Sequence, residues 1–265
     1  MKAEAWKLSS GLFGNSKLLK ERYSPVSYMP RIPLIEDLTG DPIPFGSNIL
    51  VEYDPSSQWT AASFTIAAGW LKQDGSVSYN TLAQSPTNVR NALKRLGVDV
   101  ASLEAEPTPP NERLRVWDWY TQTLGLKSTE KLTSPIKAAD LSISFSREQF
   151  KYEPDPLRLR ITDDYSTFAR FNDEKSMIEF TLTRAYPLAS ILKSTGVGAL
   201  MRGVHGESVY SRLEAGSDGI VDIKVEEVGG EVKNLLRIRT MRNVGFDSRW
   251  HPLKIDQNFE VTLEK

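Results

Sequence analysis

Residues 49–60, ILVEYDPSSQWT, run from an apolar strand through a tight turn into the start of a helix. The helical composition continues to residue 73. A strand, a turn and a helix in this order form the unit from which parallel α/β sheets are built. Ligands of such folds bind at the carboxyl ends of the strands, which is where this turn lies. The stretch therefore predicts an α/β fold and places a candidate site at residues 53–60.

A turn of this kind binds phosphate when it reads G-x-x-x-x-G-K-[ST]. In this chain the two glycine positions hold Tyr53 and Gln58, the lysine position holds Trp59, and only Thr60 matches. The glycines let backbone N–H groups approach phosphate oxygens, and the lysine neutralises their charge. This chain has neither the two glycines nor the lysine at these positions. The sequence predicts a degenerate phosphate loop at Tyr53, Ser56, Gln58, Trp59 and Thr60.

Composition excludes several classes of protein. The 265 residues are 40% hydrophobic and 25% charged, which is typical of a soluble domain. No apolar run reaches the ~18 residues that span a membrane, and no signal peptide opens the chain, so we expect a cytoplasmic protein without membrane contact. With no cysteine and two histidines, we expect no disulfide, no thiolate nucleophile and no metal site.

The formal net charge of −1 gives no overall attraction to nucleic acid, but the charge is uneven. Residues 1–31 hold six Lys or Arg against two Glu, a local charge of +4. Residues 231–254 hold six against one Glu and one Asp, again +4. Most such clusters are solvated faces or subunit contacts, and nucleic-acid binding is the minority interpretation. We divide the chain into a basic N-terminal arm, residues 1–30, and one domain, residues 31–265.

Strands and helices alternate along the domain until residue 219, where the apolar period changes to two. The residues around Gly229-Gly230 then predict a β-hairpin. This order predicts a mostly parallel sheet with an antiparallel edge. The other predicted strands are 48–53, 77–82, 114–120, 157–162, 197–204 and 258–264. The predicted helices are 60–73, 89–96, 136–150 and 173–195, the last kinked at Pro187.

With these elements placed, the chain resembles the KaiC-like branch of the RecA superfamily of P-loop NTPases, which is common in archaea and bacteria. The similarity runs from about Arg31 to the C-terminus. It implies a RecA-like three-layer α/β/α fold with a mostly parallel central sheet and a C-terminal antiparallel β-hairpin. The segments that carry it are IPFGSNILVEYDP (43–55), SPTNVRNALKRLGVDV (85–100), RLRVWDWYT (113–121), LRLRITDDYS (157–166) and the hairpin with its following Arg-containing motif (217–255).

The resemblance also implies what has been lost. The acidic pair that activates the attacking water in the family aligns with Ala83 and Gln84, which cannot accept a proton from water. The lysine of the family's Lys-x-Arg intersubunit motif aligns with Thr240, while its arginine is kept as Arg242. The magnesium-site aspartate aligns with Asp163. Together with the degenerate loop, these replacements predict no catalytic residue and no nucleotide cofactor.

Several residues have two interpretations. Tyr53 and Trp59 either fill the former phosphate cavity as a plug, which we favour, or form an aromatic platform for another ligand, or are exposed. Asp163 and Asp164 either cap the next helix, which we favour, or act at the sheet rim. His205 is expected on a surface loop. Arg237 and Arg239 share one face of a strand and are expected on a solvated face of the hairpin, or otherwise at an anion or subunit contact. Trp117 and Trp119 are expected in the core.

The sequence supports three functional hypotheses. The first is a non-catalytic pseudo-ATPase with a regulatory, sensory or scaffolding role, which acts through a protein partner or through self-association into a homo-oligomer. The alternative is a DNA-associated recombinase paralogue that binds DNA through the basic arm and the hairpin. The third is an enzyme with other chemistry at Asp163, Asp164 and His205, for which no set of nucleophile, base and orienting residue is visible.

Overall fold

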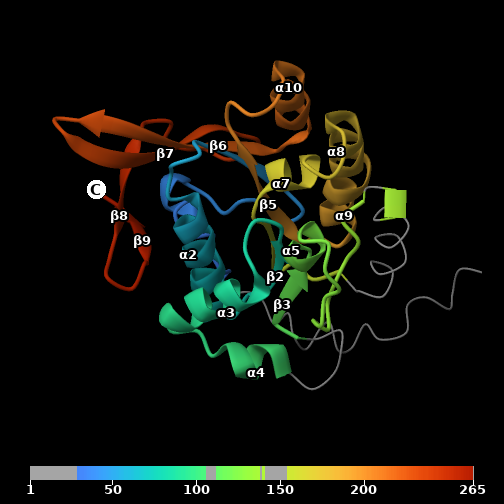
Figure 1. Cartoon of the computed structure of the whole chain (residues 1–265). Helices are drawn as coiled ribbons and strands as arrows, with labels where there is room; N and C mark the ends of the chain where they lie inside the picture. The colour runs from blue at the N-terminus through green and yellow to red at the C-terminus, as the bar shows by residue number, and fades with distance from the viewer. Residues whose placement is uncertain (1–28, 106–111, 138, 141–153, 265) are drawn as a thin grey trace, which may run out of the picture.

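The computed structural model describes residues 29–105, 112–137, 139–140 and 154–264 (Figure 1). The predicted N-terminal arm lies outside the described residues, apart from Met29 and Pro30. Most of the predicted helix 136–150 also lies outside them.

The described residues form a nine-stranded sheet in the order β3-β2-β4-β5-β1-β6-β7-β8-β9. Neighbours from β3 to β6 run parallel, and β6 to β9 run antiparallel. The predicted fold class, a mostly parallel sheet with an antiparallel hairpin, is therefore confirmed. The strands are β1 (Asn48–Tyr53), β2 (Ser76–Thr81), β3 (Leu114–Asp118), β4 (Arg158–Thr162), β5 (Thr195–Met201), β6 (Gly219–Val228), β7 (Glu231–Met241), β8 (His251–Ile255) and β9 (Val261–Leu263).

Helices cover both faces of the sheet (Figure 1). Every residue of β1 is buried, and its side chains alternate between two cores. Val51 belongs to the core under α2, α3 and α4, whereas Leu50 belongs to the core under α7, α8 and α10. The helices are η1 (Glu36–Leu38), α2 (Trp59–Lys72), α3 (Pro86–Arg95), α4 (Val100–Ala105), α5 (Tyr120–Thr123), α7 (Tyr165–Ala169), α8 (Glu174–Phe180), η2 (Thr181–Ala185), α9 (Tyr186–Ile191) and α10 (Glu207–Gly216).

Local chemistry explains where several elements begin and end. Ser85 caps α3 by accepting from the Asn88 backbone N–H at 3.2 Å, with Pro86 in the first turn. Gly97 follows the helix with φ of +79°. In the β6–β7 turn, Gly229 and Gly230 both have positive φ, as a two-residue hairpin turn requires. The predicted hairpin is confirmed.

The predicted kink at Pro187 takes a different form. The helix does not break there; a π-helical turn, η2, joins α8 to α9 just before the proline. A π turn re-routes the backbone hydrogen bonds where Pro187 has no N–H to donate. Our predictions also missed α4, α5, α7, α10 and β8, and the predicted strand 197–204 begins two residues and ends three residues after β5.

Candidate functional site

The turn at residues 54–58 is hydrogen-bonded to the two hairpin strands, β6 and β7. The Asp54 backbone N–H donates to the Ile223 carbonyl at 3.0 Å, and the Asp54 carboxylate accepts from the Val225 N–H at 3.0 Å. The Gln58 N–H donates to the Asn234 side-chain oxygen at 2.9 Å. Gln58 stands at the second glycine position of a phosphate loop, so the side chain of Asn234 occupies a donor that a phosphate oxygen would otherwise take.

Tyr53 and Trp59 fill the space between this turn and the end of β4. Trp59 is 2% exposed and Tyr53 is 7% exposed. Their ring centroids are 6.2 Å apart, and the Trp59 indole N–H donates to the Asp163 carbonyl at 2.7 Å. Burial raises the pKa of Tyr53, and the charge and hydrogen bond of Asp164 add to the shift. The burial agrees with a packed plug and contradicts the exposed and ligand-platform interpretations.

Asp163 is buried and binds backbone groups of its own chain. Its carboxylate accepts from the N–H groups of Leu82 at 2.7 Å, Ala83 at 3.1 Å and Gln84 at 3.0 Å. Burial raises the pKa of Asp163 to about 7, and the three N–H donors oppose that shift. Ala83 and Gln84 are the positions of the replaced acidic pair. The carboxylate therefore joins the end of β4 to the segment after β2, and does not cap a helix as we expected.

Asp164, in contrast, is the N-cap of α7. Its carboxylate accepts from the N–H groups of Ser166 and Thr167, both at 2.9 Å, and from the Thr167 hydroxyl at 2.7 Å. This arrangement satisfies backbone donors that a helix leaves unpaired in its first turn. Asp164 therefore caps a helix, as expected, but the helix is α7, which our predictions missed; the helix that we predicted next, α8, is capped by Asp173.

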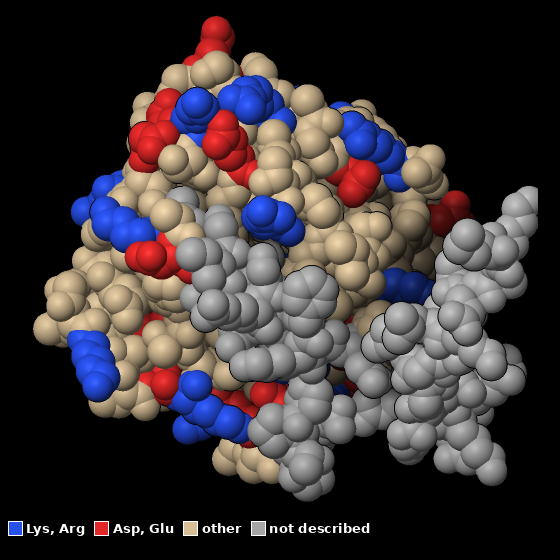
Figure 2. Space-filling view, turned by 90° about the vertical axis from the view of Figure 1, so that its right-hand side faces the viewer, with Lys and Arg blue, Asp and Glu red and all other residues tan. Residues whose placement is uncertain are grey.

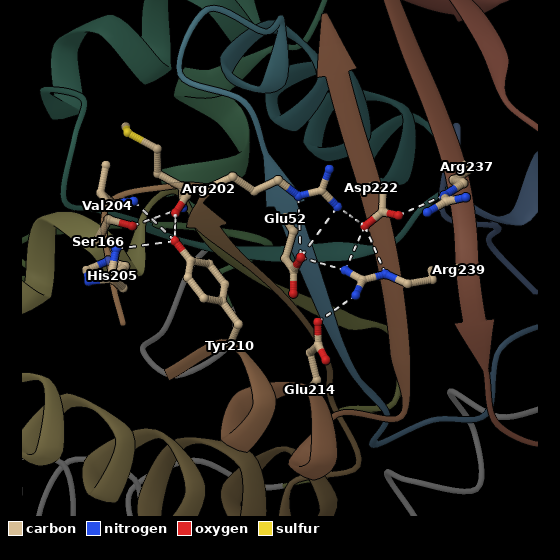
Figure 3. Close-up of polar contacts among 11 residues, drawn as sticks. Glu52, Ser166, Arg202, Val204, His205, Tyr210, Glu214, Asp222, Arg237 and Arg239 are labelled. Atoms are coloured by element: carbon tan, nitrogen blue, oxygen red, sulfur yellow. Dashed lines mark hydrogen bonds and ion pairs between the residues drawn. The ribbon is translucent and has the colours of Figure 1, made fainter. Parts of the chain in front are cut away.

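Tyr53 and Trp59 lie on the α2 face of the sheet. A network of ion pairs lies on the opposite face of β1, β6 and β7 (Figure 3). Asp222 is 0% exposed and accepts from Arg237 Nε at 2.8 Å, from Arg239 at 2.8 and 3.2 Å, and from Arg202. Glu52 accepts from Arg239 at 2.5 Å and from Arg202 at 3.4 Å. Two buried carboxylates thus hold three arginines, and we call this set, completed by Glu214 of α10, the β1–β6–β7 ion-pair network.

The network corrects our interpretation of the hairpin arginines. Arg237 and Arg239 were expected on a solvated face, but both bind Asp222, and Arg239 also binds Glu214 of α10 at 2.6 Å. The sequence held one signal for this arrangement. Glu52 stands inside the apolar run ILVEY, and a carboxylate in a central strand needs a cationic partner.

The network makes stability depend on pH. Burial raises the pKa of Glu52 to about 7, and the nearby Glu214 carboxylate adds to the shift. From about pH 4.5 to about pH 7 the folded chain keeps a proton that the unfolded chain has released, so the free energy of unfolding falls as pH rises. Glu52→Gln should flatten this slope in urea unfolding series across that range. Asp163 contributes in the same direction, so part of the slope remains. Glu226→Gln, on the exposed part of β6, is the control; a slope unchanged in Glu52→Gln would contradict the assignment.

The loop between β5 and α10, residues 202–206, includes a side chain that is more buried than predicted. His205 was expected on the surface, but its side chain is 7% exposed, and its Nδ1 lies 3.0 Å from Glu174 Oε1. Tyr210 donates to the Met201 carbonyl at 2.8 Å, and Ser166 Oγ accepts from the Met201 N–H at 2.9 Å (Figure 3). These contacts hold the end of β5 between α7 and α10.

The remaining candidate residues lie at the surface. Thr240 is exposed on β7. Arg242 is exposed, donates to the Ala215 carbonyl at 2.9 Å, and lies 3.6 Å from Asp218. Ser56 and Thr60 of the degenerate loop are exposed as well. Arg242 therefore contacts its own α10 and remains accessible.

Two further observations concern the described residues as a set. They include no group of three or more His, Cys, Asp or Glu side chains arranged to hold a metal ion. None of their helices has the length and apolar character needed to cross a membrane.

A family model described as the KaiC ATPase matches residues 31–264. The chain belongs to the KaiC family. A crystal structure of a KaiC-like protein from the hyperthermophilic archaeon Pyrococcus horikoshii OT3 superimposes with a TM-score of 0.68, at 15% identity, over 90% of this chain and 98% of that one. A search of the curated proteins gives no match. The resemblance read from the sequence, and with it the RecA-like fold, is therefore confirmed.

The structure also shows functional-site residues that the sequence analysis missed. Asn234 contacts the degenerate loop, and Glu52, Arg202 and Asp222 form the centre of the ion-pair network. Only Glu52 had a signal in the sequence, as an acid within an apolar strand. The contacts of Arg202 with Glu52 and of Asn234 with Gln58 join residues 150 and 176 positions apart in the chain. The contact of Asp222 with Arg237 depends on the pairing of β6 with β7.

Proposed function

We propose that this KaiC-family protein does not turn over nucleotide and acts as a regulatory, sensory or scaffolding protein through protein contacts. One observation carries the proposal. Trp59 stands at the lysine position of the phosphate loop. Its side chain is buried against Tyr53, and its indole N–H donates a hydrogen bond to the Asp163 carbonyl. A side chain held in this way supplies no positive charge to a phosphate and fills the space between the loop and the end of β4.

Energetics support the proposal. Micromolar affinity for ATP requires about 8 kcal/mol of binding free energy. Each charge-assisted hydrogen bond contributes about 1.5–3 kcal/mol, and the missing lysine and loop N–H contacts would account for several. The start of α2 offers an anion only about 0.3–1 kcal/mol. Binding by this route is then millimolar or weaker, and hydrolysis fails with it, because phosphoryl transfer depends on positioning and charge stabilisation.

The proposal predicts that Mg-ATP leaves the melting temperature unchanged. A site with micromolar Kd would gain about 4 kcal/mol at about 1 mM ligand, a shift of about 8–16 °C for a domain of this size. Differential scanning fluorimetry and a phosphate-release assay, both with the full chain, measure the two consequences. A rise of several degrees, or phosphate release above background, would contradict the proposal. Thr60→Val, which removes the retained hydroxyl, would then show whether the ATP occupies the loop.

Under the proposal the chain acts by binding other proteins, either a separate partner or further copies of the chain. Arg242 supports it, because this side chain is accessible beside α10. No described feature favours the DNA-binding alternative to the same degree. Arg237 and Arg239 are bound to carboxylates, and Figure 2 shows basic and acidic side chains intermixed on the face that it presents.

A further inference from the structure

Glu214 of α10 faces a buried carboxylate of β1. Glu52 is 4% exposed, and its Oε2 accepts from Arg239 and Arg202, whereas its Oε1 is buried without a hydrogen-bond partner among the described residues. The Glu214 carboxylate lies within hydrogen-bonding reach of Glu52, and the two side chains point toward each other in Figure 3. Two ionised carboxylates placed in this way repel each other, and Oε1 then has no donor. One proton between them removes both costs.

The other charged groups packed around this pair come from three places in the fold. They are Arg202 after β5, Asp222 of β6, and Arg237 and Arg239 of β7. Arg239 reaches both carboxylates, because it donates to Glu52 Oε2 at 2.5 Å and to Glu214 Oε1 at 2.6 Å. This contact leaves Glu52 Oε1 without a donor when both acids are ionised. The arginines therefore bring the two carboxylates together but do not replace a proton between them.

The proton belongs on Glu52. Burial raises the pKa of Glu52 to about 7, and the Glu214 carboxylate adds to the shift. Despite the partial burial of Glu214, its hydrogen bonds with Glu52 and Arg239 lower its pKa. The protonated Glu52 carboxyl then donates, and the Glu214 carboxylate accepts. This hydrogen bond is present on the acidic side of neutrality and is lost as the pH rises through about 7.

Helix α10 also holds the loop 202–206 at the carboxyl edge of the sheet. The Tyr210 hydroxyl donates to the Met201 carbonyl at 2.8 Å and accepts from the N–H groups of Val204 at 3.3 Å and His205 at 3.4 Å. Arg202, which begins this loop, contacts Glu52 itself (Figure 3). A change in how α10 is fastened to β1 therefore acts on the loop from both of these contacts.

We propose that Glu52 and Glu214 share one proton that fastens α10 to β1 at mildly acidic pH, and that its loss at mildly alkaline pH loosens α10 and the loop 202–206. The pair lies on the face of the sheet opposite Trp59. The proposal therefore goes beyond the proposed function and does not depend on the loss of nucleotide binding. It gives the chain a response to pH at the edge where parallel sheets usually contact their ligands.

Hydrogen exchange of the full chain at about pH 6 and about pH 8, with rates corrected for the intrinsic effect of pH, tests the fastening of α10. The protection factors of amides 211–216 should fall at least about threefold between the two conditions, the equivalent of one hydrogen bond. The amides of β4 report the loss of global stability over the same range. A local effect requires that α10 lose more protection than β4 does.

Two variants fix the contact in opposite states. Glu52→Gln supplies an amide N–H₂ that donates to Glu214 at every pH, so amides 211–216 should stay protected in both conditions. Glu214→Ala removes the partner at a partly exposed position, so these amides should be weakly protected in both. Glu207→Gln, at an exposed position of the same helix, is the matched control and should keep the pH response of the parent.

The N–H signal of Val204 in ¹H–¹⁵N spectra reports the loop. Histidines change charge between about pH 5 and 8, so this signal is followed in His205→Gln, which removes the histidine of the loop. It should shift with the same midpoint as the protection of α10. Tyr210→Phe removes the hydroxyl that joins α10 to the loop, and it should abolish the shift while α10 keeps its response.

Four results would overturn the proposal. The first is protection of α10 that changes no more than that of β4, and the second is a pH response of α10 that survives in Glu52→Gln. The third is a response of α10 that disappears in His205→Gln, which would make the histidine the titrating group. The fourth is a Val204 signal that does not follow α10. None of them bears on the ATP experiment, which probes the other face of the sheet, so the two proposals can fail independently.

Discussion

Replacing Trp59 with alanine should lower the free energy of unfolding by about 3–5 kcal/mol, the usual cost of deleting a large buried aromatic side chain. The indole is 2% exposed, packs against Tyr53 and donates to the Asp163 carbonyl, so the variant loses packing and a buried hydrogen bond together. Urea unfolding followed by circular dichroism measures the change. A loss of this size would show that the degenerate loop now stabilises the domain.

Two further variants sharpen the result. Trp59→Phe keeps a ring against Tyr53 but loses the indole donor, and its stability should lie between parent and alanine variant. Trp250→Ala is the control at a half-buried tryptophan: the cations of Lys224 and Arg237 lie over its ring at 4.0 and 4.5 Å from the centroid, contacts of about 0.5–1 kcal/mol each. If Trp59→Ala unfolds like the parent, the side chain is accessible in solution and the ligand-platform interpretation returns.

The sequence was sufficient for the features that depend on local pattern. The apolar run 48–53 and the period change at residue 219 predicted β1 and the hairpin, because burial on a strand repeats every two residues. Short helices such as α7 and α10 were missed. They span five and ten residues, and they are stabilised by caps and by packing against the second core.

The candidate site was predictable in position but not in its contacts. The turn at 53–60 lies where the strand–turn–helix order placed it. The partners of Asp163 depend on how β4 pairs with β2, a register between residues about 80 positions apart, and no local pattern encodes it. The same reason hid the arginine partners: alternation showed that Arg237 and Arg239 share a face, but Asp222 reaches them only through the pairing of β6 with β7.

Asp222→Asn should destabilise the protein by about 3–5 kcal/mol, which is the cost of removing one side of a buried ion pair. Asp222 is fully buried, and its carboxylate accepts from Arg202, Arg237 and Arg239. An asparagine keeps the volume but offers one oxygen, and its amide N–H₂ faces guanidinium donors. The arginines then lose a counter-charge close to the buried strands β1 and β6, and urea unfolding should report the loss directly.

The control is Asp74→Asn, which breaks an ion pair with Arg113 at 3.4 Å where Asp74 is almost fully exposed, and exposed pairs contribute about 0–1 kcal/mol. Arg237→Met tests the mechanism, since its Nε donates to Asp222 at 2.8 Å. If repulsion among unpaired arginines causes the loss, Arg237→Met combined with Asp222→Asn should cost less than the sum of the two single changes. Additive costs, or a loss below about 1 kcal/mol for Asp222→Asn, would contradict a network centred on Asp222. The hairpin would then be held to β1 by its backbone ladder and apolar side chains alone.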